Sequence, residues 1–342
     1  MSQPLLTIIV PTCNRAQCLR TLLGALISEL AGLEGRVMVV IGDNASSDDT
    51  PALAAAFAAG WPATLLLRHE RNLGPDENFC RCIDRVGSRY FWIIGDDDLP
   101  RAGLLRALMH LLVRNAPDLV YMKSLWSPEL TDHDPCNSVQ ALDAVHMDRF
   151  TFARRIHVWT TFISGVVVRR EFAAGPALRR FAGTSLVQLG WVLNALDRGE
   201  CFVYVRSVGV LATSGNTGGY RVLQVFGCNF QRITQDALSG SPASRRMARQ
   251  MIKRTTLMFL PHLIWQFRVG TLGDFTTKEP LAEAMSPQVR RSLAYGLLLQ
   301  PIAQWPKPAA RVVLKLADIA ARFVAVWDGL MARIFGKMEQ CE

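Results

Sequence analysis

The sequence predicts an α/β fold, with a mostly parallel sheet flanked by helices, followed by a basic amphipathic helical region at the C-terminal end. Short continuous apolar runs, which are typical of buried parallel strands, alternate with segments whose apolar residues recur at helical spacing. The connections between them are short, as in a parallel α/β layer. Half of the 342 residues are apolar, so the chain can bury a sizeable core.

Strands and helices are expected to alternate along the first 125 residues. The apolar run at 5–11 is stopped by its proline, and the helix after it carries leucines at helical spacing, with Thr12 or Asn14 as its cap. An alanine-rich helix is expected over 50–60. Further strands are expected at 37–41 and within "ATLLLR", "YFWII" and "DLVYMKS", with helices over about 76–86 and up to about 115.

Polar residues follow each of the first four expected strands. Ligands of such sheets bind outside the carboxyl ends of the strands, so these residues are candidates for a binding site. Neither GxGxxG nor GxxxxGK[ST] is present, which excludes the usual dinucleotide fingerprint and the P-loop. The residues are Thr12, Asn14 and Arg15 after the first strand, Asp43 and Asn44 after the second, Arg71, Asn72 and Gly74 after the third, and Asp96, Asp97 and Asp98 after the fourth.

Three consecutive carboxylates follow the fourth strand in "FWIIGDDDLP". Two like charges ~5 Å apart repel by roughly 3 kcal/mol at an effective dielectric constant of about 20, so a positive group or water must lie nearby. One interpretation is a solvated turn that caps the next helix, with Asp98 as the N-cap and Pro100 near the first helical position. The other is a site for Mg²⁺ or Mn²⁺, because such cations are often held by one or two carboxylates plus substrate phosphates.

Four motifs stand in order along the chain: "IIVPTCNR", "VVIGDNASSDDT", "RNLGPDENF" and "GDDDL". With them, residues 1–125 resemble the nucleotide-sugar-binding half of glycosyltransferase family 2, which has the GT-A fold, a Rossmann-like architecture. The resemblance continues through 126–240, the expected acceptor-side half, and leaves 241–342 as a helical, membrane-associating region. It implies that a nucleotide diphosphate sugar is bound by Pro11, Thr12, Asn14, Arg15, Asp43, Asn72, Gly74 and Asp96.

In that family the acidic motif binds Mg²⁺ or Mn²⁺, which bridges the diphosphate and stabilises it as it leaves. The implied metal residues are Asp96, Asp97 and Asp98, in one of two frames. Aligned on "DDL", Asp97 is the ligand, Asp96 lies near the ribose, and Asp98 lies outside the metal's ligands or on the acceptor side. Read as Asp-x-Asp, the pair is Asp96 and Asp98.

The segments "FISGVVVRREF" and "GWVLNALDRGECFVYVRSVGVLATSGN" resemble the acceptor side of the family. Many members carry Glu-Asp at the start of the helix, the aspartate being the general base, and alignment on Gly199 puts Val187 and Gln188 there. Glutamine cannot usefully accept a proton, so the base lies elsewhere or the mechanism differs from the standard inverting one. Candidate substitutes are His157, Asp197 and Asp98, of which only the histidine titrates near neutral pH without help.

Within the family, "GPDENF", "GDDDL" and the closing Gly215-Asn216 look most like the abequosyltransferase-type branch, which adds dideoxysugars or related hexoses to lipid-linked O-antigen units. The expected function is transfer of such a sugar to a hydroxyl of a lipid-linked saccharide, in cell-surface polysaccharide or O-antigen synthesis. Two alternatives stay open. A catalytically inactive glycan-binding or assembly subunit is favoured by Gln188, whereas a sugar nucleotidyltransferase would normally have a glycine-rich loop where "PTCNRAQC" stands.

Most of the net charge of +9 falls after residue 243, where basic residues accompany long apolar runs. This pattern favours an anionic membrane surface over nucleic acid as a partner. The uncharged windows there contain proline and are shorter than the ~18 to 20 residues needed to span a bilayer. A basic amphipathic helix is expected at 309–337, with one apolar face made of Val312, Leu316, Ile319, Phe323, Trp327, Leu330 and Ile334.

The expected location is cytoplasmic, peripheral on the inner face of the cytoplasmic membrane. The eight cysteines include no CxxC pair or zinc-type spacing, and nothing resembling a secretory signal precedes "LLTIIVP", which together favour a reducing compartment. An alternative stays open for the C-terminal helices, which could instead pack on the catalytic domain or on a second copy in a homo-oligomer.

Overall fold

The computed structural model describes residues 3–127, 138–175, 179–214, 219–272 and 279–338, without the side chains of 324–338. It divides into two compact units. The first comprises Met1–Asn216 and Ile233–Ala248, and the second comprises Thr217–Arg232 and Arg249–Glu342. Gly215 and Asn216, on which the branch assignment partly depends, lie outside the described residues.

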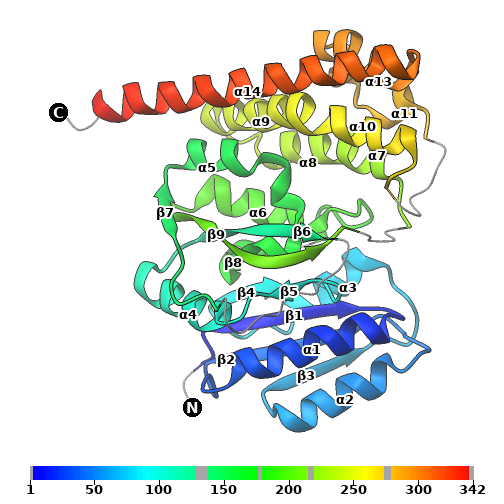
Figure 1. Cartoon of the computed structure of the whole chain (residues 1–342). Helices are drawn as coiled ribbons and strands as arrows, with labels where there is room; N and C mark the ends of the chain where they lie inside the picture. Colours follow the sequence, from blue (N-terminus) through cyan, green and yellow to red (C-terminus); the bar gives the residue numbers. More distant parts are fainter. Residues whose placement is uncertain (1–2, 128–137, 176–178, 215–218, 273–278, 339–342) are drawn as a thin grey trace. The chain divides into compact units, whose positions relative to one another are not determined.

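All the described strands of the first unit belong to one sheet (Figure 1). Its order is β3-β2-β1-β4-β8-β6-β9-β5, and β7 pairs with β9. The first four of these strands are parallel, whereas β8 runs antiparallel to both β4 and β6. The bounds are β1 Leu6–Thr12, β2 Val37–Asp43, β3 Thr64–Arg68, β4 Tyr90–Ile93, β5 Leu99–Pro100, β6 Leu119–Ser127, β7 Ala144–Met147, β8 Val166–Arg169 and β9 Phe202–Thr213.

Helices cover both faces of this sheet. Alternate side chains of β1, β2 and β4 pack with α1, α2 and α4 in one buried cluster, and α3 and α6 cover the opposite face, where Phe91 of β4 meets Trp191 of α6 edge to face. The predicted α/β fold is therefore confirmed. The helices are α1 Ala16–Leu30, α2 Thr50–Gly60, α3 Pro75–Ile83, α4 Leu104–Asn115, α5 Arg149–Ile156 and α6 Val187–Arg198, with 3₁₀ turns at His157–Thr161, Ile163–Gly165 and Arg170–Ala173.

Two of the predicted helix caps are wrong. Neither Thr12 nor Asn14 caps α1, whose first amide, that of Ala16, instead donates to Oδ2 of Asp48 at 3.0 Å. Asp98 caps no helix either, because Leu99 and Pro100 form β5, paired with β9, and α4 begins only at Leu104. A residue 32 positions away thus binds the first amide of α1, and Asp98 precedes a strand rather than a helix.

The described part of the second unit is helical. Its separate buried cluster includes Leu260, Ile264, Ile302 and Val313. The bounds are α7 Val222–Gln224, α10 Leu260–Val269, α11 Leu281–Ala284, α12 Pro287–Arg290, α13 Gln300–Gln304 and α14 Lys307–Met338, and α8 Phe230–Ala237 and α9 Pro242–Arg254 have residues in both units. Five-residue π-helical turns occupy Val225–Asn229, Thr255–Phe259 and Tyr295–Leu299.

The last helix, α14, agrees with the amphipathic helix predicted at 309–337. Val313 and Ala317 are buried, whereas Val312, Leu316, Ile319 and Phe323 are each at least half exposed. Among the described residues, no helix is both long enough and apolar enough to span a bilayer.

Candidate active site

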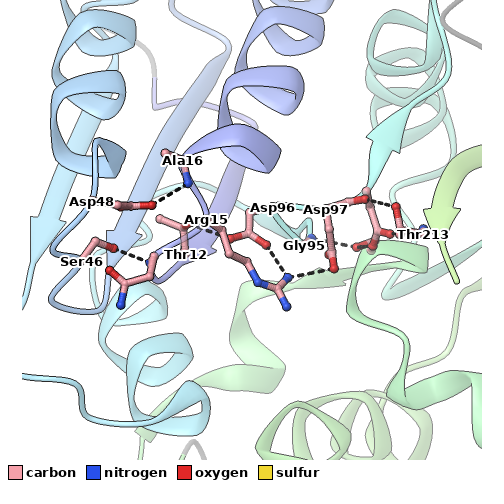
Figure 2. Close-up of polar contacts among 12 residues, drawn as sticks. Thr12, Arg15, Ala16, Ser46, Asp48, Gly95, Asp96, Asp97 and Thr213 are labelled. Atoms are coloured by element: carbon pink, nitrogen blue, oxygen red, sulfur yellow. Dashed lines mark hydrogen bonds and ion pairs between the residues drawn. The ribbon is translucent and has the colours of Figure 1, made fainter. Parts of the chain in front are cut away.

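The acidic turn, Asp96 to Asp98, connects β4 to β5 at the carboxyl end of the parallel strands (Figure 2). Its backbone is tight, because the amide of Asp98 donates to the carbonyl of Gly95 at 3.1 Å. A Cβ placed on Gly95 would lie 3.0 Å from Oδ1 of Asp97 and 3.1 Å from Oδ2 of Asp98. Glycine at this position therefore lets both carboxylates fold back over the turn.

Asp96 is buried against the end of β1. Its Oδ2 accepts a hydrogen bond from Oγ1 of Thr12 at 2.7 Å, and its Oδ1 accepts one from Nη1 of Arg15 at 3.0 Å. Burial raises the pKa of Asp96 to about 6, although Arg15 and Thr12 both act to lower it. The structure thus brings together three residues that the sequence analysis placed after two different strands.

Arg15 also binds Asp97. The same Nη1 atom lies 2.9 Å from Oδ2 of Asp97, so one guanidinium bridges two carboxylates. The guanidinium of Arg15 is therefore the positive group near the acidic turn, one of the two possibilities that the three consecutive aspartates predicted. Asp97 is the more exposed of the two carboxylates that Arg15 binds, with 14% of its side chain accessible against 6% for Asp96.

Asp98 has partners on the second half of the sheet. Its Oδ2 accepts a hydrogen bond from Oγ of Ser164 at 2.5 Å, and its Oδ1 accepts one from the amide of Thr213 at 3.2 Å. Burial raises the pKa of Asp98 to about 7. The sequence analysis missed Ser164 and Thr213 as site residues, although both lie in segments that it assigned to the acceptor side.

The loop after β2 is hydrogen-bonded to the loop after β1. Asp43 is buried; its Oδ1 accepts from the amide of Ser46 at 2.9 Å, and its Oδ2 has no hydrogen-bond partner but lies 3.4 Å from Nε of Arg68. Asn14 has a left-handed backbone, with φ of 53°, and its Oδ1 accepts from the amide of Ser47 at 2.7 Å. Pro11, next to the end of β1, pairs with Gly42.

The loop after β3 joins the same region through two asparagines. Nδ2 of Asn44 donates to Oδ1 of Asn72 at 2.9 Å, and the amide of Gly74 donates to that same oxygen at 2.8 Å. Gly74 has φ of 80°, which a residue with a Cβ would adopt only under strain. The predicted donor-binding residues from β1, β2 and β3 thus lie in one hydrogen-bonded group of loops.

Gln188, which aligns with the expected general base, lies in the first turn of α6. Its Nε2 donates to the carbonyl of Thr161 at 3.1 Å, and its Oε1 is buried without a hydrogen-bond partner. His157 is also buried, at the start of the 3₁₀ turn that contains Thr161. Asp197 accepts a hydrogen bond from Ser244 near the other end of α6, about 13 Å along the helix axis from Gln188.

Asp76 fixes the start of α6 and is a residue that the sequence analysis missed. Its Oδ2 accepts from the amides of Thr184 and Ser185 at 2.9 Å each, and its Oδ1 lies 3.4 Å from the amide of Val187. Ser185 has φ of 59°, so the chain enters α6 through a left-handed residue. The position of Gln188 therefore depends on a carboxylate from α3.

The acidic turn suits a hard divalent cation that a ligand helps to hold. Among the residues that the structure describes, no three His, Cys, Asp or Glu side chains converge where they could enclose a metal ion. The donors present are carboxylate oxygens, of which Oδ1 of Asp97 is turned away from Arg15 and toward Gly95. That donor set fits Mg²⁺ or Mn²⁺ bound by one or two carboxylates, with phosphate oxygens completing the coordination.

The fold and the position of this site define an α/β protein of GT-A type, with polar residues gathered at the carboxyl ends of its parallel strands. Residues 7–167 match the family model described as glycosyl transferase family 2. An uncharacterised protein of Mycobacterium tuberculosis (strain CDC 1551 / Oshkosh), MT1568, is 32% identical over 111 residues, which cover 31% of this chain and 32% of that protein.

Solved structures agree on the fold. The crystal structure of S. aureus TarS is similar with a TM-score of 0.58 and 14% identity, over 93% of this chain and 54% of that chain. TarS 1-349 in complex with UDP-GlcNAc has a TM-score of 0.56 at 13% identity, over 93% of this chain and 91% of that chain. The mannosyltransferase PcManGT from Pyrobaculum calidifontis, in complex with GDP-Man and Mn²⁺, has a TM-score of 0.55 at 16% identity, over 96% and 88%.

Proposed function

We propose that the protein is a metal-dependent glycosyltransferase that moves a sugar from a nucleotide diphosphate donor to a saccharide hydroxyl. The observation that carries this proposal is the contact of Thr12 and Arg15, at the end of β1, with Asp96 and Asp97 in the acidic turn. A nucleotide base and a diphosphate need such neighbouring sites at the carboxyl edge of a parallel sheet. UDP-GlcNAc in the TarS complex, and GDP-Man with Mn²⁺ in the PcManGT complex, support a donor of this class.

Four aspartates and one arginine among the predicted residues have specific parts in the proposed site. Asp43, with one buried carboxylate oxygen that lacks a hydrogen bond, would accept one from the base or ribose. Asp97 would hold Mg²⁺ or Mn²⁺, with Asp96 beside the ribose and Asp98 positioned on the acceptor side. When bound, the cation would neutralise the departing diphosphate. Arg15, already between two carboxylates, would keep the remaining negative charge of the turn compensated.

The proton of the acceptor hydroxyl needs a base that Gln188 cannot supply. The Oε1 atom of Gln188 is buried without a hydrogen-bond partner, and as an amide oxygen it could accept a hydrogen bond but could not remove a proton. This feature keeps a second candidate, an inactive glycan-binding subunit, in consideration. His157 stays our candidate for the base, and the acceptor we propose is a lipid-linked saccharide of cell-surface polysaccharide or O-antigen synthesis.

Thermal-shift titration of nucleoside diphosphates with and without Mn²⁺ tests the donor site, because a ligand bound only by the folded state raises the apparent stability. We expect at least one of UDP, GDP, CDP and dTDP to raise the melting temperature, and Mn²⁺ to enlarge that rise. Asp97→Asn should abolish the Mn²⁺-dependent part. Asp143→Asn is the matched control, since Asp143 is an exposed carboxylate paired with Arg206.

The proposal fails if no nucleoside diphosphate shifts the transition in either condition. Where a nucleoside diphosphate does bind, slow hydrolysis of the donor separates the two candidates. An enzyme hydrolyses its donor in the presence of Mn²⁺, whereas an inactive subunit binds the nucleotide without turnover.

A further inference from the structure

An exposed aromatic cluster, formed by Trp126, Trp159 and Phe162, lies on the first unit. Trp126 and Trp159 are 44% and 37% exposed, which is unusual for the largest apolar side chains. The rings of Trp126 and Phe162 have centroids 4.8 Å apart, and those of Trp126 and Trp159 are 6.2 Å apart and tilted by 42°. The two indoles therefore present a continuous but angled apolar surface to solvent.

Two short stretches of chain connect this aromatic cluster to residues that bind the acidic turn. Trp126 precedes Ser127, which pairs with Thr213 in the parallel β6–β9 ladder, and neighbouring strands lie about 5 Å apart. Thr213 donates its Oγ1 hydrogen to the carbonyl of Asp97 at 2.6 Å and its amide hydrogen to Asp98. Phe162 is two residues before Ser164, which donates to Asp98 from the other direction. The chain thus connects the cluster directly to both residues that bind Asp98.

The cluster is held in place before any ligand arrives. A Cβ on Gly165 would lie 2.8 Å from Cδ1 of Phe162, so the phenyl ring rests directly on the backbone there. The amide of Phe162 donates to the carbonyl of Trp159 at 3.1 Å, and Gln188 holds the intervening Thr161 carbonyl. The Trp126 ring therefore packs on a fixed neighbour, Phe162, which reduces the conformational entropy that its indole can lose on binding.

We propose that Trp126 and Trp159 form the acceptor subsite and bind a sugar ring by stacking its C–H face on the indoles. This inference rests on the proposed function and specifies which residues bind its saccharide acceptor. A pyranose has an apolar face that matches the two exposed indoles and a rim of hydroxyls that suits the polar edge of the sheet, where Asp98 binds Ser164 and Thr213. An alkyl chain would place no hydroxyl against that polar edge, which makes it the less suitable occupant.

Saturation-transfer NMR with methyl glycosides tests this subsite directly. The probes are methyl glycosides of the common hexoses, N-acetylhexosamines and 6-deoxyhexoses, each measured with and without UDP or GDP and Mn²⁺. We expect at least one glycoside to receive saturation on the protons of one ring face. In the double variant Trp126→Ala/Trp159→Ala its affinity should fall by at least about fivefold, the size expected for removing central aromatic contacts.

Two controls make the result specific. Trp305→Ala removes another exposed tryptophan, which is 52% accessible and belongs to the second unit, and should leave glycoside binding unchanged. Trp126→Phe/Trp159→Phe retains aromatic faces and should retain most of the affinity. Tetraethylene glycol monooctyl ether, which has an alkyl chain but no sugar, should not compete with the glycoside.

Three results would overturn the proposal. They are absence of saturation transfer to every glycoside in both conditions, equal affinity in the double alanine variant, and displacement of the glycoside by the sugar-free amphiphile. Because binding is measured without turnover, failure here is distinct from failure of the donor site, which the nucleoside diphosphate titration detects separately.

Discussion

Arg15 donates from a single nitrogen to Asp96 and Asp97, which makes the acidic turn compatible with a packed environment. The sequence predicted that a positive group or water must lie near the three carboxylates, and it placed Arg15 at the same edge of the sheet. It could not predict how the three carboxylates diverge. Asp98 is held by Ser164 and Thr213, which are 66 and 115 residues away along the chain, and no local pattern reports contacts of that separation.

Asp98 should make the metal-free protein less stable as the pH rises. Its pKa is raised to about 7 in the folded state, chiefly by burial, against an ordinary value near 3.8. Between these values the folded state keeps a proton that the unfolded state has released, so the free energy of unfolding falls as the pH rises through this window. Asp98→Asn replaces the protonated carboxyl group with an amide that also has one acceptor oxygen and a donor but does not titrate. This variant should lose less stability than the wild type between pH 5 and pH 8.

The measurement is the melting temperature across that range in buffer containing a chelator. Asp96, whose pKa is also raised, remains in both proteins and leaves a residual slope. Asp143→Asn should follow the wild-type curve. Parallel curves for wild type and Asp98→Asn would contradict the account.

Long-range carboxylates, more than local caps, determine where the helices of the first unit begin. Glu29 of α1 accepts hydrogen bonds from the amides of Gly103 and Leu105 at the start of α4, at 2.6 and 2.8 Å, and Asp76 of α3 does the same for α6. The strands and helices themselves were predictable, because apolar spacing depends on burial. The caps were not, because a carboxylate 74 residues away leaves no signature beside the helix it serves.

Asp76→Ala should destabilise the first unit and displace the start of α6. Removing the carboxylate leaves buried amides near Thr184 without an acceptor, which costs about 2 to 3 kcal/mol. Asp148→Ala is the control, since Asp148 caps α5 from an exposed position and its loss should cost about 1 kcal/mol. Urea unfolding followed by fluorescence measures both. Equal effects of the two substitutions would show that Asp76 is an ordinary cap.

At the scale of the whole molecule, the charge and the exposed apolar surface concentrate in the second unit. Leu316, Ile319 and Phe323 of α14 are 55%, 50% and 72% exposed, and Lys315 and Arg322 accompany them. A basic amphipathic surface of this kind suits the interface of an anionic bilayer. We therefore propose peripheral attachment to the inner face of the cytoplasmic membrane through α14.

The variant Leu316→Gln/Ile319→Gln/Phe323→Gln should reduce flotation with anionic vesicles by at least about tenfold, since each buried apolar side chain contributes about 1.5 to 3 kcal/mol. Point substitutions are preferable to truncation at residue 300, which would remove the fully buried Ile302. Ile27→Gln/Val113→Gln changes exposed apolar residues of the first unit and serves as the control. Unchanged flotation of the triple variant would instead favour packing of α14 against protein.

The central claim is that the acidic turn holds a divalent cation against a nucleotide diphosphate. Anomalous diffraction at the manganese edge, from crystals grown with Mn²⁺ and the nucleoside diphosphate that gives the largest thermal shift, tests it most directly. We expect one strong peak bonded to the carboxylate of Asp97 and to the diphosphate, with the base beside Asp43. A diphosphate bound elsewhere, or a turn that holds no manganese while Arg15 still bridges Asp96 and Asp97, would contradict the claim.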